Sequence, residues 1–325
     1  MNKSYQSVIN SLGSSRVKIN ESLAPHTYMK VGGPADLFFT ATTKQDLIDA
    51  VQTAIKNKVN HFILGGGSNI LVSDSGIKGL VIKNRADTIK IIGLSGKLKN
   101  QRAGINQAVI EVQAGATVNQ LVRFTIEESL KGLEEFLGIP GTVGGAVYNN
   151  SHHLDHLIGD HIKEVEVIDQ KGKVKTYTQK QMHFAYNYSI LQKTKEVVLS
   201  VKFQLKSGNK TQLWQKAEAA LKRRRDTQPL EFPSSGCMFK NIGKAQALLH
   251  NTPNQATSAG FLIDNAGLKG TQIGGAKVSE KHANFIINTG NATAKDIKKL
   301  TQLVQKRIKE KYHINLKSEV FFIGE

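Results

Sequence analysis

Apolar residues along the chain follow two spacings, one typical of helices and one typical of strands. Helical spacing is expected over residues 1–24, 45–56, 118–128, 212–225, 259–268 and 294–311. Strand-like patterns occupy residues 27–43, 61–64, 70–72, 79–116, 163–205, 237–239, 285–287 and 319–323. Residues 242–258 are polar and are expected to form an inserted loop. This mixture, without an internal repeat, predicts an α+β fold of two or three sub-domains in 325 residues.

The chain lacks the patterns of a secreted or membrane-spanning protein. No apolar run approaches the roughly 20 residues needed to cross a bilayer, and the N-terminus lacks the apolar middle of a secretory signal. Cys237 is the single cysteine, which excludes an intrachain disulfide and a zinc site built from paired cysteines. We therefore expect a cytoplasmic protein.

The net charge of +18 attracts phosphates of any kind without saying which. A solubilising lysine-rich surface, nucleic-acid binding and recruitment of a phosphorylated substrate all remain open on charge alone. Zinc-finger spacing, an RNP-like aromatic string and a polybasic arm are all absent, since the longest basic run is Lys222–Arg225. We expect no nucleic-acid or membrane partner.

The first glycine-rich segment follows a short apolar run and contains Gly65, Gly66 and Gly67, with Ser68 and Asn69 after them. Glycines allow backbone amides to turn toward a phosphate, and a pyrophosphate would fit such a loop. A plain tight turn explains three glycines equally well. The segment is neither the Rossmann fingerprint nor a P-loop, because the required G-x-G-x-x-G and Gly-Lys-Ser/Thr patterns are missing.

The second glycine-rich segment, GIPGTVGGAVYNN, begins at Gly138 and is more specific. Pro140 fixes one turn, while Gly141, Gly144 and Gly145 remove side chains over a span that fits a planar cofactor or its diphosphate. Two such segments within one unit suggest one ligand held from two sides.

Together the two segments resemble the FAD-binding region of the vanillyl-alcohol-oxidase-like flavoproteins. Within that class the chain resembles the UDP-N-acetylenolpyruvoylglucosamine reductase family, also called UDP-N-acetylmuramate dehydrogenase. The matching blocks, in the family's order, are LAPHTYMKVGGPADLFF, LGGGSNILV, GIPGTVGGAVYNN, QPLEFPSSGCMFKN, AGFLIDNAGLKGTQIGGAKVSEKHANFIIN and SEVFFIGE.

The resemblance implies a two-part FAD-binding domain, residues 1–79 and 80–206, and a C-terminal α+β substrate-binding domain, residues 207–325. It implies that NADPH reduces a non-covalent FAD and that hydride then passes to the enolpyruvyl group of a UDP-sugar, giving UDP-N-acetylmuramate for peptidoglycan. The residues implied in FAD binding are Gly65, Gly66, Gly67, Ser68, Asn69, Ile70, Gly138, Pro140, Gly141, Thr142, Gly145 and Ala146. We expect a monomer.

The implied chemistry adds hydride to the terminal carbon of an enol ether conjugated to a carboxylate, so a donor must protonate the adjacent carbon. Cys237 stands where the family has a serine donor. A lone cysteine is more often a small buried hydrophobe, but an unperturbed thiol, with a pKa of about 8.5, is mostly protonated at neutral pH. Glu319 matches the family's catalytic glutamate; the alternative interpretation is that Glu319 is a surface carboxylate at the end of a strand.

Asn187 departs from the family, because it stands where an arginine belongs in a Tyr-Arg-x-Ser motif. Three explanations compete. Another cation reaches the site in place of the arginine; the charged donor is lost without replacement, which would cost about 3 kcal/mol of transition-state stabilisation; or the substrate differs. We favour another cation, with Lys240 or one of Arg223, Arg224 and Arg225 as the candidate. The residues expected to bind substrate are Tyr186, Ser189, Arg224, Lys240 and Asn241.

A cluster of His152, His153, Asp155 and His156 replaces the family's small residues after the second segment. Side chains at neighbouring positions do not point to one face, so we expect a polar loop over the flavin rather than a metal site. One of these histidines could also compensate for the arginine that Asn187 replaces. The loop at residues 242–258 is either a gate or a plain surface excursion. An FAD oxidoreductase with another substrate and a weakened flavin- or UDP-sugar-binding homologue remain rival readings.

Overall fold

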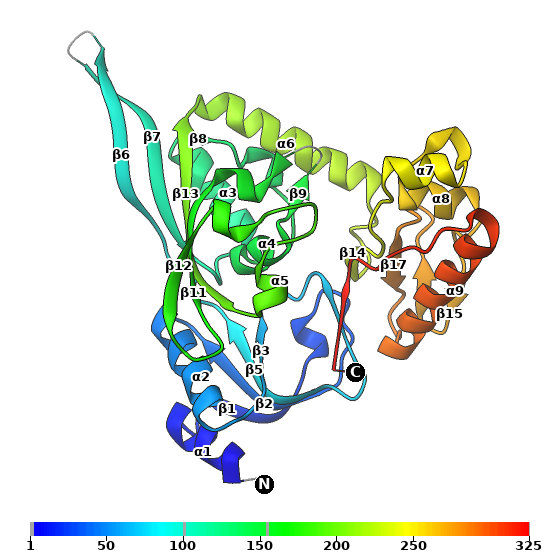
Figure 1. Ribbon diagram of the computed structural model, residues 1–325, viewed down its shortest axis with the longest axis horizontal. Helices are drawn as coiled ribbons and strands as arrows, with labels where there is room; N and C mark the ends of the chain where they lie inside the picture. The colour runs from blue at the N-terminus through cyan, green and yellow to red at the C-terminus, as the bar shows by residue number, and fades with distance from the viewer. Residues whose placement is uncertain (1–2, 100–101, 154–155, 325) are drawn as a thin grey trace. The chain divides into compact units, whose positions relative to one another are not determined.

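The computed structural model describes residues 3–99, 102–153 and 156–324 (Figure 1). The chain forms two compact units, each assembled from segments far apart in sequence. Unit 1 comprises Met1–Ile19, Leu37–Gly66 and Gly79–Arg224. Unit 2 comprises Asn20–Asp36, Gly67–Lys78 and Arg225–Glu325.

The N-terminal part of the chain forms a sheet of order β1-β2-β5-β3, in which β3 and β5 are parallel. Its elements are α1 (Lys3–Leu12), β1 (Val17–Ser22), β2 (Pro34–Ala41), α2 (Lys44–Lys56), β3 (His61–Leu64) and β5 (Ile77–Asn84). Apolar residues of both helices, among them Val8 and Val51, share a core with Phe39 of β2 and Ile82 of β5. The expected helix over residues 1–24 is wrong beyond Leu12, because Gly13 adopts the left-handed φ of +92° that ends helices.

Unit 1 also contains an antiparallel sheet of order β12-β11-β13-β7-β6, with β8 pairing β13. Its strands are β6 (Ile89–Lys99), β7 (Arg102–Gln113), β8 (Leu130–Lys131), β11 (Ile162–Ile168), β12 (Val174–Thr178) and β13 (Val197–Ser207). Figure 1 shows β6 and β7 as a long hairpin that extends beyond the neighbouring strands. The expected strands over residues 79–116 are confirmed by β5, β6 and β7. Those over residues 163–205 are confirmed in β11, β12 and β13, whereas Lys180–Met182 and Leu191–Thr194 form short helical turns instead.

Helices cover this second sheet through apolar side chains. They are α3 (Val118–Glu127), α4 (Val143–Asn149), α5 (Leu191–Thr194) and α6 (Lys210–Thr227). Leu121 of α3 and Val147 of α4 are fully buried in one core with Ile110 of β7 and Phe203 of β13. The second glycine-rich segment therefore begins a helix packed on the sheet, since Gly144 and Gly145 lie inside α4.

Unit 2 contains an antiparallel sheet of order β14-β17-β16-β15 and a parallel pair, β18 and β4. Its strands are β4 (Ile70–Val72), β14 (Ser234–Cys237), β15 (Gln272–Ile273), β16 (Ala276–Val278), β17 (Phe285–Asn288) and β18 (Phe321–Ile323). Its helices are α7 (Lys244–Leu249), α8 (Ala259–Asn265) and α9 (Ala294–Tyr312). Thr293 caps α9, and Asp74 accepts hydrogen bonds from the amides of Ala294 and Lys295 at 2.8 and 3.0 Å.

The segment 242–258 is more ordered than the expected loop, because α7 and a 3-10 turn at Pro253–Gln255 occupy much of it. Gln246 at the third position of α7 reaches back to the amide of Gly243, so a local cap starts the helix in a polar sequence. Among residues 3–99, 102–153 and 156–324, no helix combines the length and apolar character that a membrane span needs.

Candidate active site

The two glycine-rich segments meet backbone to backbone in unit 1. A β-carbon on Gly66 would lie 2.5 Å from the α-carbon of Gly141, and a β-carbon on Gly65 would lie 2.4 Å from Oγ1 of Thr142. Any side chain at these glycines would push the segments apart, so this approach requires glycine. The two segments, expected to hold one ligand from two sides, therefore do lie side by side.

Hydrogen bonds to its backbone carbonyls hold the first segment in place. Two of its backbone amides remain available to a ligand. Nζ of the buried Lys83 donates to the carbonyl of Gly65 at 2.6 Å, and the amide of Tyr28 donates to the carbonyl of Gly67 at 3.0 Å. Within the described part of the chain, no backbone carbonyl accepts from the amides of Gly66 or Gly67. Two such N–H groups in a glycine loop fit the oxygens of a phosphate.

The second segment is anchored by residues that its sequence alone does not indicate. The amide of Gly138 donates to Oδ1 of Asn119 in α3 at 2.7 Å, and Gly138 adopts a φ of +86°. The amide of Gly144 donates to the carbonyl of Ala114 at 2.9 Å, and Ala146 is buried in α4. These contacts fix the part of the segment around Pro140 and Gly141 that touches the first segment.

Cys237 and Glu319 lie on neighbouring extended segments of unit 2. The amide of Glu319 donates to the carbonyl of Met238 at 2.8 Å, and Phe239 forms an antiparallel bridge with Ser318. Cys237 ends β14, where it pairs with Phe285 of β17, and both Cys237 and Glu319 are half-buried. The fold therefore brings the two predicted catalytic residues together from distant parts of the sequence.

The end of the first glycine-rich segment joins this pair. The amide of Phe321 donates to the carbonyl of Asn69 at 3.1 Å, and Nδ2 of Asn69 donates to the carbonyl of Glu319 at 3.4 Å. Oγ of Ser235 donates to the carbonyl of Ile70 at 3.0 Å. Asn69 thus contacts the backbone at and after Glu319, and Ile70 accepts from the side chain of Ser235, two residues before Cys237. Both residues are among those predicted to hold the cofactor, and Ser68 precedes them directly.

The backbone beside Cys237 is fixed by Asn284, a residue that the sequence reasoning did not single out. Oδ1 of Asn284 accepts from the amide of Phe239 at 2.9 Å, and Nδ2 donates to the carbonyl of the same residue at 2.8 Å. Asn284 is buried within the HANFIIN block. A polar amide beside an apolar run of the sequence is the signal that could have identified this residue, because a buried amide needs hydrogen-bond partners.

Lys240 and Asn241, two substrate-binding candidates that follow Cys237, differ in their contacts. Oδ1 of Asn241 accepts from the amide of Ala259 at 3.0 Å, so this side chain also fixes the start of α8. Lys240 is half-buried, and its amide donates to the carbonyl of Lys317 at 2.9 Å.

Asn187 lies in a tight turn of unit 1, where Ala185 and Tyr188 exchange two backbone hydrogen bonds of 3.1 Å. It adopts a left-handed φ of +51°, which asparagine tolerates better than most residues, and it is buried. Oγ of the buried Ser189 donates to the carbonyl of Tyr148 at 2.7 Å, which ties the turn to α4. Tyr186 at the tip of the turn is 46% exposed.

His152, His153 and His156 of the cluster lie on a short antiparallel strand pair, β9 (His152–His153) with β10 (His156–Leu157). The ring of His152 packs against that of Tyr186, with centroids 4.8 Å apart. Burial lowers the pKa of His153, and the nearby Arg224 lowers it further. Asp155 lies outside the described residues, and the described His, Cys, Asp and Glu side chains form no group of three or more suited to a metal ion.

Arg224 packs against the second glycine-rich segment. A β-carbon on Gly138 would lie 3.6 Å from Nε of Arg224 and 2.7 Å from the side chain of Leu221. The guanidinium therefore lies close to a loop whose glycines the sequence assigns to the cofactor.

Comparisons with known proteins agree with this geometry. Residues 35–178 match the family described as FAD binding domain, and residues 228–323 match the UDP-N-acetylenolpyruvoylglucosamine reductase, C-terminal domain. The solved structure of p-cresol methylhydroxylase shares the fold at a TM-score of 0.53 and 12% identity, covering 99% of this chain and 89% of that one. The FAD binding domain thus has the vanillyl-alcohol-oxidase-like fold, and the two family matches make the chain an FAD-dependent oxidoreductase.

More similar relatives narrow the class. A UDP-N-acetylenolpyruvoylglucosamine reductase of Caldanaerobacter subterraneus is 36% identical over 97% of this chain and 96% of its own length, and one of Clostridium botulinum strain 657 is 38% identical over 97% and 94%. The crystal structure of the Thermus caldophilus reductase has a TM-score of 0.73 at 32% identity, covering 95% of this chain and 99% of that one. The chain belongs to the UDP-N-acetylenolpyruvoylglucosamine reductase family.

Proposed function

We propose that the chain reduces UDP-N-acetylglucosamine enolpyruvate to UDP-N-acetylmuramate, a precursor of peptidoglycan, with FAD as cofactor and NADPH as reductant. The observation that carries this proposal is the pairing of Cys237 and Glu319 on neighbouring segments, next to Asn69 and Ile70 of the first glycine-rich segment. Family membership supplies the reaction, and the local geometry supplies residues suited to it.

FAD, when bound, supplies the hydride that adds to the terminal carbon of the enolpyruvyl group. The close contact of Gly66 with Gly141 and the available amides of Gly66 and Gly67 fit its diphosphate. The residues that would hold FAD are Gly65, Gly66, Gly67, Ser68, Asn69, Ile70, Gly138, Pro140, Gly141, Thr142, Gly145 and Ala146.

Cys237 protonates the carbon next to the substrate carboxylate. Its S–H bond breaks, a C–H bond forms at that carbon, and the thiolate that remains takes up a proton from solvent to complete the cycle. Glu319, whose backbone is fixed through Met238, organises the proton donor and the enol intermediate. Asn284 is a positioning residue, because both polar atoms of its amide hold the backbone of Phe239, two residues after Cys237.

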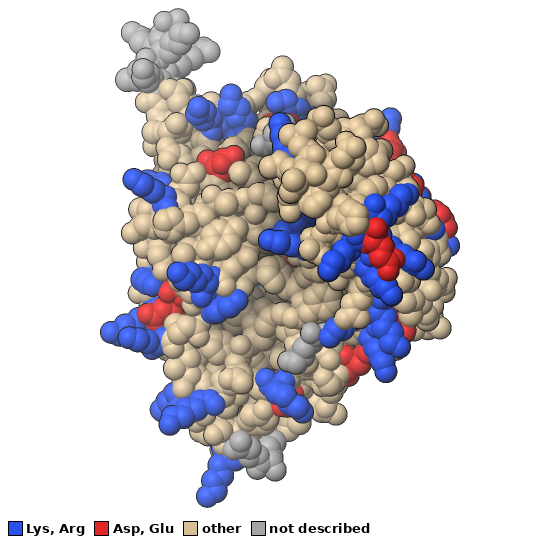
Figure 2. Space-filling view, turned by 45° about the vertical axis from the view of Figure 1, so that its right-hand side comes forward, with Lys and Arg blue, Asp and Glu red and all other residues tan. Residues whose placement is uncertain are grey.

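The UDP-sugar is bound by Tyr186, Ser189, Arg224, Lys240 and Asn241. Figure 2 shows basic side chains spread over the visible face, several of them beside acidic ones. Such a distribution, with a net charge of +18, supports recruitment of two polyanions, NADPH and the UDP-sugar. We further propose that the protein acts in the cytoplasm as a monomer.

Two measurements on the purified protein test the function. The absorbance spectrum should show bound flavin. NADPH should then reduce this flavin, and UDP-N-acetylglucosamine enolpyruvate should reoxidise it, so that NADPH consumption depends on the substrate. Rapid reduction without substrate-dependent reoxidation would show that this reaction is not the one catalysed.

A further inference from the structure

Asn187 presents a buried amide that the described part of the chain leaves without a hydrogen-bond partner. The residue is 1% exposed, and neither Nδ2 nor Oδ1 has a partner of good geometry among the described residues. Buried polar groups are normally paired, so an orphaned amide points to a missing ligand.

Hydrogen bonds fix the backbone from which this amide projects. Nε2 of Gln192 donates to the carbonyl of Asn187 at 3.0 Å, and the same nitrogen donates to the carbonyl of Tyr148 at 3.3 Å. Ala185 and Tyr188 close the turn from both sides. The turn therefore presents an unpaired donor and acceptor from a fixed backbone, which is one requirement of a preorganised binding site.

The imidazole of His152 faces this amide. Its ring packs on Tyr186, the residue before Asn187, at an interplanar angle of 51°. Burial lowers the pKa of His152, and the nearby Asn187 partly opposes this effect, although the two side chains do not meet in hydrogen-bonding geometry. Burial favours the neutral form of the imidazole, which, like the amide, offers an N–H donor without a formal charge.

Neighbouring His153 differs in its surroundings, because Arg223, Arg224 and Glu135 all act on it. No described charged side chain contributes to the pKa shift of His152. A carboxylate is planar and has two acceptor oxygens, so an amide N–H and an imidazole N–H can each donate to one of them.

We propose that His152 and Asn187 together bind the carboxylate of the enolpyruvyl group, with His152 supplying the donor that an arginine at position 187 would otherwise supply. This inference rests on the proposed function. It assigns His152 a task in binding the substrate, and it explains why the turn keeps an unsatisfied amide in its interior.

The test compares three variants of the FAD-loaded enzyme. His152→Ala removes the donor, and His152→Gln restores an N–H donor. His156→Ala is a matched control on the strand that pairs with β9, where Nε2 of His156 lies 3.3 Å from Glu135. Flavin reduction by NADPH and flavin reoxidation by UDP-N-acetylglucosamine enolpyruvate are followed separately. Binding to oxidised enzyme is measured from the substrate-induced change in the flavin spectrum, without turnover.

We expect His152→Ala to weaken substrate binding and reoxidation by about tenfold to a hundredfold, as loss of a hydrogen bond to a charged group does. Flavin reduction and the melting temperature should stay unchanged, and His152→Gln should recover part of the loss. Unchanged substrate binding in His152→Ala, or an equal loss in His156→Ala, would overturn the inference alone. Wild-type enzyme that fails to reoxidise with substrate would overturn the proposed function and this inference with it.

Discussion

The backbones of Gly66 and Gly141 are in direct contact, although their segments lie in different parts of the sequence: a β-carbon on Gly66 would stand 2.5 Å from the α-carbon of Gly141. This separation is shorter than any real contact of a β-carbon. The neighbouring atom is backbone rather than a flexible side chain, so a substitution has to move the whole second segment. The contact therefore links the two halves of the proposed cofactor site.

Gly66→Ala should reduce FAD retention and lower stability. Forcing a methyl group into this contact is a small-to-large change that typically costs about 1–3 kcal/mol, and it separates the segments that would hold the cofactor. The flavin-to-protein ratio after purification and the melting temperature measure the two effects.

A matched control for that variant is Gly243→Ala, because a β-carbon on Gly243 would meet no atom within 4 Å and its φ is −71°. This control should retain its flavin and its melting temperature. A Gly66→Ala protein with full flavin content and unchanged stability would show that the close contact has no role in binding.

Cys237→Ala should slow flavin reoxidation by substrate while leaving flavin reduction by NADPH intact. A positioned general acid contributes about a hundredfold to ten-thousandfold, so a loss in that range is expected in the oxidative half-reaction alone. Cys237→Ser keeps an O–H donor of similar size and should retain much more activity than the alanine variant. Rapid-mixing absorbance of the flavin separates the two half-reactions, and equal slowing of both would remove Cys237 from the role of proton donor.

Asn187→Arg tests whether this position faces the reacting carboxylate. A guanidinium offers a charge and a paired set of donors, so kcat/KM with the substrate should be preserved or raised, and the gain should be larger in a His152→Ala background. The left-handed φ of +51° opposes the change, because arginine tolerates this conformation less well than asparagine. Steady-state kinetics of the single and double variants measure the effect, and loss of FAD binding in Asn187→Arg would show that the position serves the fold instead.

Sequence patterns identified most elements, because long helices and strands carry a clear apolar period. The helix ending at Lys56 and the strands on either side of Gln170 are examples, and a capping box at Thr43 starts the former. The strand beginning at Val17 was missed, since five of its six residues are not fully buried and alternation is weak there.

The residues of the candidate site were predictable from sequence motifs, but their arrangement in space was not. Cys237 and Glu319 stand in recognisable motifs, but their adjacency depends on an antiparallel bridge between Phe239 and Ser318, which no local pattern specifies. Asn284 and Asn119 act through hydrogen bonds to distant backbone, so their roles emerge only when the chain is folded. The same holds for His152, whose packing on Tyr186 is a tertiary contact.

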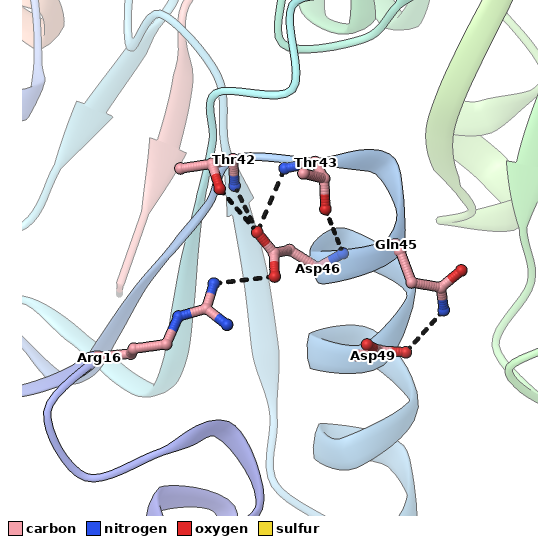
Figure 3. Close-up of polar contacts among 6 residues, drawn as sticks. All are labelled: Arg16, Thr42, Thr43, Gln45, Asp46 and Asp49. Carbon is pink, nitrogen blue, oxygen red and sulfur yellow. Dashed lines mark hydrogen bonds and ion pairs between the residues drawn. The ribbon is translucent and has the colours of Figure 1, made fainter.

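Asp46 in the first turn of α2 contacts three residues through one carboxylate (Figure 3). Its Oδ1 pairs with Arg16 at 2.8 Å, while Oδ2 accepts from the hydroxyl and amide of Thr42 and from the amide of Thr43. Burial opposes ionisation, but the bonds from Arg16 and Thr42 outweigh it and lower the pKa of Asp46 from 3.8 to about 2.

Asp46→Asn should therefore lower the free energy of unfolding by about 1–2 kcal/mol at pH 7, where the carboxylate is fully charged. A carboxyl whose pKa is depressed by folding stabilises the protein above its unfolded pKa and loses this contribution as pH falls through the folded value. The difference in the free energy of unfolding between wild type and variant should accordingly be constant at neutral pH and should shrink as the pH falls from 3.8 toward about 2. Urea unfolding at several pH values measures it. Asp49→Asn is the control, because Asp49 lies on the same helix and accepts one exposed hydrogen bond from Gln45 at 2.8 Å. A similar loss of unfolding free energy in that variant would contradict the assignment of the effect to the Arg16–Asp46 contact.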